Sequence, residues 1–417
     1  MSHPDQVVDP RALRALPGLR LVFTAATLAR LSFATLVLSL LLTVQAATGS
    51  YAVAGTALGA YGIAGSTMPA KARLLDTRGP RRVLPLLSTL FALALLALAL
   101  AARSGVGVAA VHVTGAAVAG LVAPPVGPTM RAVWARLTPD PAARQRAYSL
   151  DAVVESGVFA VGPVLAAVLV QAATPATALV CTAAAHLLGS SVMATSPLLT
   201  RPAGRAPDQP DAEPPAGSSR RRRVLGPLTR PGYPALLLFA AAVGLGNDPL
   251  EVAVVARGER AGPAVASGLL LAVLALSAAA GGLGWGRLAG TDHGRRLRDV
   301  PPWTVLAALA AVTSLAAAVA AVAPGLVWLA AALVVVGAAS APLAVVVYTA
   351  ADRFGATDGG SEATSWVTTA TNLGASLGTA AAGALIDVHG TAGAFWAGAA
   401  VTAVAGAGAW AYGHRGR

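Results

Sequence analysis

Three charged side chains lie inside long apolar stretches of this sequence, where charge is costly and therefore informative. Arg30 lies about ten residues into the first such stretch, and Asp151 and Glu155 lie near the start of the fifth. We predict an Arg30–Glu155 pair, with Asp151 one helical turn away sharing the pair or relaying protons. A carboxylate that alternates between an arginine and an apolar pocket can load and release a proton. The alternative is a static ion pair that holds two helices together.

A second group of polar side chains lies close together at Asn247, Asp248 and Glu251, with Pro249 between the two acids. The acids are three residues apart and share one helix face, whereas proline removes a backbone donor and breaks the helix. The group therefore indicates a broken helix with two acids beside a substrate path. If the helix instead ends early, the acids simply begin a loop that also holds Glu259.

Isolated polar side chains in other apolar stretches are weaker candidates, and the sequence holds no pattern typical of an enzyme. Asn372 lies among threonine and serine side chains that can hydrogen-bond between helices, and a lone histidine such as His112 is more often structural. There is no phosphate-binding loop, metal-ligand cluster or nucleophile–base pair. We expect no catalysis, no cofactor and no bound metal. The remaining weak candidates are Gln45, Trp134 and Trp366.

The elements that must position these residues are membrane-spanning helices. Of the 417 residues, 56% are apolar and only 12% are charged, about half the charged share of a soluble domain. The apolar residues form blocks of about 20, long enough to cross a hydrocarbon layer of about 30 Å. They predict twelve helices at about 21–46, 51–72, 83–103, 106–130, 148–171, 176–198, 233–256, 262–288, 301–322, 325–350, 363–387 and 391–412.

The basic residues are distributed unevenly over the predicted loops. If the N-terminus is cytoplasmic, 26 of the 30 basic residues lie on that side, three lie on the other side and Arg30 lies inside a helix. This satisfies the positive-inside rule, and the inverse topology violates it. The net charge of +12 therefore needs no nucleic-acid partner. Both tails, 1–20 and 413–417, and the polar linker at 199–232 are predicted to be cytoplasmic. Because 29 of the 30 basic residues are arginine, the expected location is the cell membrane of a bacterium with a GC-rich genome.

Short motifs of the first half recur in the second half at a nearly constant offset of about 215 residues. Several matches at one offset indicate a parallel repeat with six helices in each copy, at 21–198 and 233–412. The matching pairs are Leu74 and Leu288, Pro125 and Pro342, and Gly162 and Gly378.

The loop at 72–82 resembles the signature loop of the major facilitator superfamily. Ala72 replaces the opening glycine of that pattern, and Gly290 replaces the acid in the second copy. The resemblance implies an all-α fold of 12 transmembrane helices, as two parallel six-helix repeats with a central cytoplasmic linker, functional as a monomer. The positions that carry it are Arg73, Asp76, Arg78, Gly79, Arg81 and Arg82 in the first copy, and Gly286, Gly294, Arg295 and Arg296 in the second.

The resemblance also implies a gating contact for this loop. Asp76 is expected to meet the N-terminus of the helix near Glu362, where the exposed amides and the helix dipole favour negative charge. That contact would tie the two halves together when the cytoplasmic side is closed. The alternative is a charge cluster that sets the topology, with a tight turn at Gly79.

The pair Gly162–Pro163 resembles the end of a motif typical of drug–proton antiporters in the same superfamily, with Ala166 and Ala167 in place of its last glycines. We expect close helix packing at Gly162 and a kink at Pro163. The resemblance favours proton-coupled efflux of a small organic molecule by alternating access. Two alternatives remain open: a proton symporter that imports a sugar or another small nutrient, and a membrane sensor or assembly protein on a transporter scaffold.

Overall fold

The structure, a computed structural model, describes residues 18–138, 141–199, 228, 230–289, 291, 300–355 and 361–415. Its regular elements within these ranges are all helical. The first half holds α2 (Leu19–Thr48), α3 (Tyr51–Gly65), α4 (Met68–Arg78), α5 (Pro80–Arg103), α6 (Ala109–Val122), α7 (Val126–Leu137), α8 (Pro141–Ala172), α9 (Pro175–Thr195) and the short η1 (Pro197–Leu199). The second half holds α11 (Tyr233–Asn247), α12 (Leu250–Ala261), α13 (Val265–Ala289), α15 (Pro302–Ala321), α16 (Leu326–Gly355) and α17 (Ser361–Arg415).

The helices of the described ranges are consistent with twelve passes. By length and composition, ten helical segments could each cross a membrane. One of them, α17, makes two passes, because the left-handed backbone of Gly390 (φ 73°) reverses its direction. The second predicted pass is divided into α3 and α4, each too short to cross alone. The chain is therefore a multi-pass membrane protein.

Two predicted helices are interrupted where the sequence analysis expected continuity. The predicted helix at 106–130 is divided into α6 and α7, and the break lies at Pro124 and Pro125. Adjacent prolines remove two backbone donors and push the preceding residue out of the helical region, so a break is the physical expectation. The other break, between α3 and α4, comes just before Pro69 in the first turn of α4, where proline is favoured.

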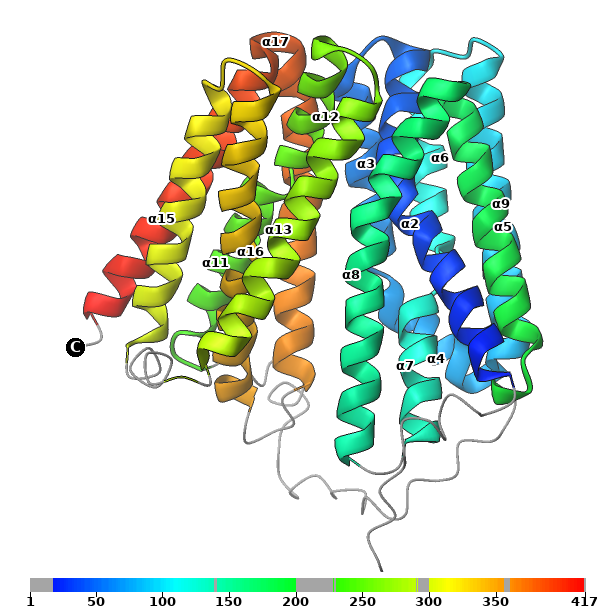
Figure 1. Ribbon diagram of the computed structural model, residues 1–417, viewed down its shortest axis with the longest axis horizontal. Helices are drawn as coiled ribbons and strands as arrows, with labels where there is room; N and C mark the ends of the chain where they lie inside the picture. Colours follow the sequence, from blue (N-terminus) through cyan, green and yellow to red (C-terminus); the bar gives the residue numbers. More distant parts are fainter. Residues whose placement is uncertain are drawn as a thin grey trace, which may run out of the picture.

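The most extensive packing between the two halves, among the described residues, is in two helix pairs, α3 with α17 and α8 with α13. We define the lower end of the molecule as the end where α2 begins and α17 ends, and the upper end as the opposite one (Figure 1). A Cβ on Gly55 of α3 would lie 2.5 Å from the carbonyl oxygen of Thr379, and one on Gly268 of α13 would lie 2.7 Å from that of Pro163. Small residues thus let the helices touch backbone to backbone.

The buried apolar clusters show where the halves are joined. One cluster spans both halves and includes Leu42 of α2 and Val254 of α12. Two other clusters each lie within one half, around Met130 in the first half and around Phe239 in the second. The former includes Leu19 at the start of α2, and the latter includes Tyr233 at the start of α11. Towards the lower end, α8 and α13 diverge (Figure 1). The halves are therefore joined in the upper part of the molecule and separate below it.

The internal repeat is visible in the packing of two equivalent glycines. A Cβ on Gly162 of α8 would meet Ala34 of α2, at 2.9 Å from its carbonyl carbon. A Cβ on Gly378 of α17 would meet Leu245 and Pro249, at the end of α11. In each half, the glycine of the fifth pass thus allows the first pass to approach closely, as expected for Gly162.

Candidate functional site

A cavity of about 250 Å³ lies between the two halves and is lined by residues of six helices and of the α11–α12 junction. Most of its wall is apolar, and the ionisable groups that line it come from the second half only. Such a cavity, mostly apolar with a few convergent polar groups, is the usual form of a small-molecule site. The lining residues are Ala34, Val37 and Leu38 of α2, Phe159 and Pro163 of α8, Asn247, Asp248 and Glu251 at the α11–α12 junction, Leu271, Leu274, Ala275 and Ala278 of α13, and Val336 and Ser340 of α16.

The two acids reach the cavity because the helix that carries them is broken. Helix α11 ends at Asn247 and α12 begins at Leu250, so Asp248 and Pro249 form the junction. The predicted break at Pro249 is confirmed. The alternative, in which the acids begin a loop, is wrong, because α12 continues to Ala261.

The carboxylates of Asp248 and Glu251 have no hydrogen-bond or ion-pair partner among the described residues. Asp248 is exposed to the cavity and Glu251 is partly exposed, although both lie deep between the halves. An unpaired charge in apolar surroundings is expensive, so wherever water does not reach these carboxylates, each must be neutralised by a proton or by a cation. The site can therefore bind and release positive charge.

Asn247 fixes this junction to the last pass of the chain. Its side-chain oxygen accepts a hydrogen bond of 3.2 Å from the Thr402 hydroxyl of α17. Across the cavity, Ser340 of α16 adds a hydroxyl group to the wall. Because α11 also packs along α17, the polar side of the cavity is held on a rigid pair of helices.

The charged residues of the first half form a different arrangement from the one predicted. Arg30 binds Asp151, not Glu155, through two hydrogen bonds of 2.7 Å and 2.9 Å, and both side chains are 3% exposed. The indole of Trp134 donates a longer bond of 3.4 Å to the same carboxylate. A carboxylate that faces the planar guanidinium with both oxygens gives the strongest geometry for such a pair. The predicted Arg30–Glu155 pair is therefore wrong, because Asp151 presents both oxygens to Arg30.

Glu155 lies outside that cluster. It faces Arg131 of α7 at 3.3 Å, with side chains 30% and 55% exposed. Neither this pair nor the Arg30–Asp151 pair lines the cavity. The geometry favours the static alternative for Arg30 and Asp151, which together join α2 to α8.

The other predicted site residues are dispersed. Asn372 is exposed on α17 and does not line the cavity. His112 is buried and its Nε2 lies 2.6 Å from the Val106 carbonyl, which fits the structural role expected for it. Pro163 lines the cavity within a continuous α8.

The signature loop is described only in part. Gly79 joins α4 to α5 with a φ of 84°, a backbone conformation that favours glycine. Arg81 donates to the Thr195 carbonyl at 3.3 Å, while Arg78 and Arg82 are exposed and Gly286 lies within α13. The side chains of Arg73, Asp76 and Glu362, and all of Gly294, Arg295 and Arg296, lie outside the described residues. The gating contact of Asp76 therefore stays a prediction.

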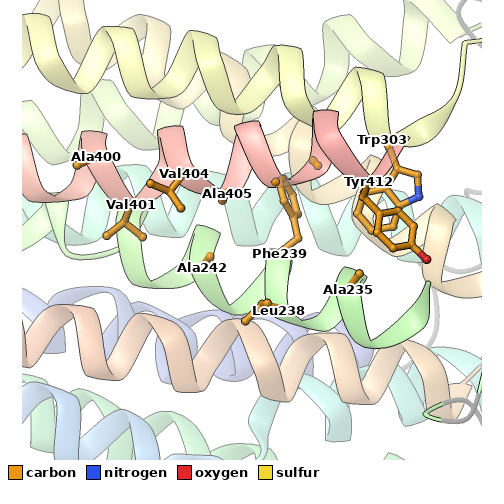
Figure 2. Close-up of a pocket in the computed structure, with 12 residues that line it drawn as sticks. Ala235, Leu238, Phe239, Ala242, Trp303, Ala400, Val401, Val404, Ala405 and Tyr412 are labelled. Atoms are coloured by element: carbon orange, nitrogen blue, oxygen red, sulfur yellow. The ribbon is translucent and has the colours of Figure 1, made fainter. Parts of the chain in front are cut away.

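A larger groove of about 610 Å³ lies within the second half (Figure 2), and neither Asp248 nor Glu251 lines it. Its wall comes from α11, α15 and α17 and holds no carboxylate or basic side chain. Leu238 and Val404 are 72% and 73% exposed there, and the rings of Trp303 and Tyr412 lie 4.8 Å apart near the lower end. Exposed apolar side chains with aromatic rings near a helix end are typical of a lipid-facing surface.

Sequence reasoning missed a group of hydrogen bonds at the upper end. There Asp387 of α17 and Glu259 of α12 bind Ser50 and Tyr51 at the start of α3. Ser50 before an apolar stretch is a recognisable helix-start signal. Nothing in one sequence indicates that an acid from the other half completes that start.

Comparison with known proteins identifies the architecture as that of a membrane transporter. The model of the family described as "Major Facilitator Superfamily" matches residues 22–361. The chain belongs to this superfamily, which indicates a transporter rather than an enzyme. A comparison with curated protein sequences finds no significant match.

Solved structures of the same fold cover nearly the whole chain. The nucleoside transporter NupG is 13% identical, with a TM-score of 0.70 over 94% of this chain and 98% of that one. A bacterial homologue of the iron transporter ferroportin, in an inward-facing state, gives the same four values. A bacterial homologue of the human lysosomal transporter Spinster, inward-facing and occupied, is 17% identical with a TM-score of 0.68 over 95% and 96%. At these identities the likeness concerns the fold alone.

Proposed function

We propose that the chain is a secondary active transporter that exports a small organic molecule in exchange for protons, by alternating access. The observation that carries the proposal is the pair Asp248 and Glu251, which lines the cavity between the halves without a partner among the described residues. The halves touch in the upper part of the molecule and separate towards the lower end. A substrate path closed at one end, with titratable groups beside it, is the arrangement that coupled transport needs.

Proton coupling follows from the surroundings of the two acids. When the cavity is open to water, solvent can support their negative charge. When the halves close around them, the apolar wall cannot, so the acids must enter that state protonated or beside a cation. A cycle that opens alternately to the two sides therefore carries protons with it.

The direction of transport is proposed from the first-half motif and from the charge distribution. Gly162 and Pro163 lie where α8 meets α2 and α13, the positions at which the drug–proton antiporter resemblance arises. With the linker in the cytoplasm, as the basic residues predict, the closed upper end faces outwards and the cavity is reached from inside the cell. A proton symporter that imports its substrate would use the same acids, but substrate and protons would then cross the membrane in the same direction.

The cavity also limits the substrate. Its volume of about 250 Å³ lies just below the range of about 300–1,000 Å³ typical of drug-sized ligands. A molecule of metabolite size, with an apolar body and one polar or cationic end facing Asp248, fits this wall.

The decisive experiment compares three carboxylate variants. A panel of compounds tested for growth of an expressing strain first finds one to which the protein gives resistance. Transport of that compound is then measured in proteoliposomes, with and without a pH gradient, for Asp248→Asn, Glu251→Gln and the control Glu155→Gln. We expect gradient-driven transport to fail in at least one cavity variant while compound exchange without a gradient persists, and the control to retain both.

Full gradient-driven transport in both cavity variants would remove Asp248 and Glu251 from the coupling mechanism. Loss in the control alone would return the role to Glu155, as the sequence first indicated. Right-side-out vesicles with a pH gradient decide direction, because an antiporter expels the compound and a symporter accumulates it.

A further inference from the structure

Four residues at the upper end form hydrogen bonds between the two halves, and the function proposed above does not use them. They are Ser50 and Tyr51 of the first half, and Glu259 and Asp387 of the second; together with the Ala52 backbone N–H, which also donates to Asp387, we call them the upper latch. We propose that the upper latch holds the upper end closed and sets the balance between the two states of the transport cycle. This rests on alternating access but not on which acid carries the proton.

Asp387 acts as the helix cap of an element in the other half. Its carboxylate accepts hydrogen bonds from the Ser50 hydroxyl at 2.7 Å, the Tyr51 backbone N–H at 3.0 Å and the Ala52 backbone N–H at 2.9 Å. Helix α3 begins at Tyr51, so these N–H groups belong to the first turn, which has no partner within the helix. A negative charge placed there also gains from the positive end of the helix dipole.

Tyr51 makes a second contact with the other half. Its hydroxyl donates a hydrogen bond to Oε2 of Glu259, near the end of α12. A Cβ on Gly383, one turn before Asp387, would meet the Tyr51 carbonyl oxygen. Tyr51 is thus held by its backbone and its side chain, and only glycine at 383 allows α17 to approach this closely.

The support behind Asp387 is rigid and lies wholly within the second half. Gly390 bends α17 three residues later. Arg257 of α12 donates to the Thr391 hydroxyl at 3.3 Å and to the Ala323 carbonyl at 2.6 Å, which fixes the bend. Asp387 is therefore held in place by the second half alone. Closing the upper end then costs little conformational entropy for ordering its side chain.

The bonds of the upper latch form or break together. All of them join the start of α3 to the second half, so an opening of the upper end separates every donor from its acceptor in one movement. A bistable contact of this kind sets populations, because its free energy is present in one state and absent in the other. Losing it shifts the equilibrium towards the state with an open upper end.

The experiment measures the distance between the upper ends of the two halves in the full-length protein. Spin labels are placed by Ser104→Cys, after α5, and Val327→Cys, at the start of α16, both exposed. The exposed native Cys181 is replaced by serine. Pulsed electron paramagnetic resonance in nanodiscs then gives the ratio of long to short distances.

Three variants and one matched control are compared. Asp387→Ala removes all three bonds, Asp387→Asn keeps one acceptor and removes the charge, and Tyr51→Phe removes only the bond to Glu259. The control Thr174→Ala removes the cap of α9, in which the Thr174 hydroxyl accepts from the Thr177 N–H at 3.1 Å. That cap lies within the first half, so the control also removes a side-chain helix cap but no contact between the halves.

We expect Asp387→Ala to raise the ratio of open to closed upper ends about tenfold, since a lost helix cap commonly costs that factor. Smaller increases are expected for Asp387→Asn and Tyr51→Phe, and none for Thr174→Ala. An unchanged ratio in Asp387→Ala, or an equal increase in the control, would overturn the proposal. If Asp387→Ala does not fold, Tyr51→Phe decides in the same way, because it keeps the ring. The measurement involves neither substrate nor protons, so it stands apart from the test of Asp248 and Glu251.

Discussion

The buried pair Arg30–Asp151 gives the sharpest test of how the first half is held together. Both side chains are 3% exposed, and two hydrogen bonds join them. Replacing Asp151 by alanine leaves the guanidinium of Arg30 without its partner in an apolar interior. Among the described side chains, the lost carboxylate also accepted a hydrogen bond from Trp134. Removing one partner of a buried ion pair costs about 3–5 kcal/mol of stability. Asp151→Ala should therefore lower the free energy of unfolding by about that amount.

The matched comparison is Glu155→Gln, four residues later on the same helix. Its partner Arg131 is 55% exposed and Glu155 itself is 30% exposed. Exposed pairs contribute about 0–1 kcal/mol, so this variant should be nearly neutral. The double variant Arg30→Met with Asp151→Ala should cost less than the sum of its single changes, because no charge is left unpaired.

Denaturant unfolding of the purified protein in detergent, followed by tryptophan fluorescence, measures all four variants. The reasoning fails if Asp151→Ala costs less than about 1 kcal/mol, or if Glu155→Gln costs as much as Asp151→Ala. If the stability losses of Arg30→Met and Asp151→Ala add up to the loss of the double variant, the two side chains do not act as a pair.

The remaining predictions concern packing and one hydrogen bond. Gly383→Ala should raise the ratio of open to closed upper ends in the spin-label measurement, because its Cβ meets the Tyr51 carbonyl, whereas Gly408→Ala on the same helix has open space and should change nothing. An unchanged ratio in Gly383→Ala would contradict the close approach of α3 and α17. Tyr233→Phe should cost about 0.5–1.5 kcal/mol in denaturant unfolding, since the buried hydroxyl donates to the Ala363 carbonyl at 2.7 Å. Tyr348→Phe removes an exposed bond of 3.1 Å and should be neutral, so an equal loss in both would refute the burial argument.

The sequence predicted the passes and the central acids because both depend on local pattern. Apolar blocks set where the helices lie, and Pro249 beside Asp248 marks a break that the structure places between α11 and α12. The predicted single helix at 106–130 was wrong, although Pro124 and Pro125 were visible in it. Hydropathy reports how apolar a segment is. It cannot reveal a break in the helix backbone when the residues on both sides of the break are apolar.

The ion-pair partner of Arg30 could not be predicted from the sequence, for a different reason. Asp151 and Glu155 lie one turn apart, so a depth estimate good to about one turn cannot separate them as partners of Arg30. Their distinction comes from α7, which brings Trp134 to one carboxylate and Arg131 to the other. The upper latch was equally hidden, because Asp387 and Ser50 come from opposite halves and meet only after the whole fold is assembled.

Helix α12 connects the two ends of the proposed mechanism. Glu251 of the cavity and Glu259 of the upper latch lie on the same helix, eight residues or about 12 Å apart along its axis. Five of the seven residues between them, Val252 to Ala256, are at most 1% exposed, so this part of the helix is tightly packed. A change of charge at Glu251 and a change of contact at Glu259 therefore act on the same rigid element. If proton binding at Glu251 shifts α12, the shift reaches Tyr51, and by reciprocity an opened upper latch then alters proton affinity in the cavity.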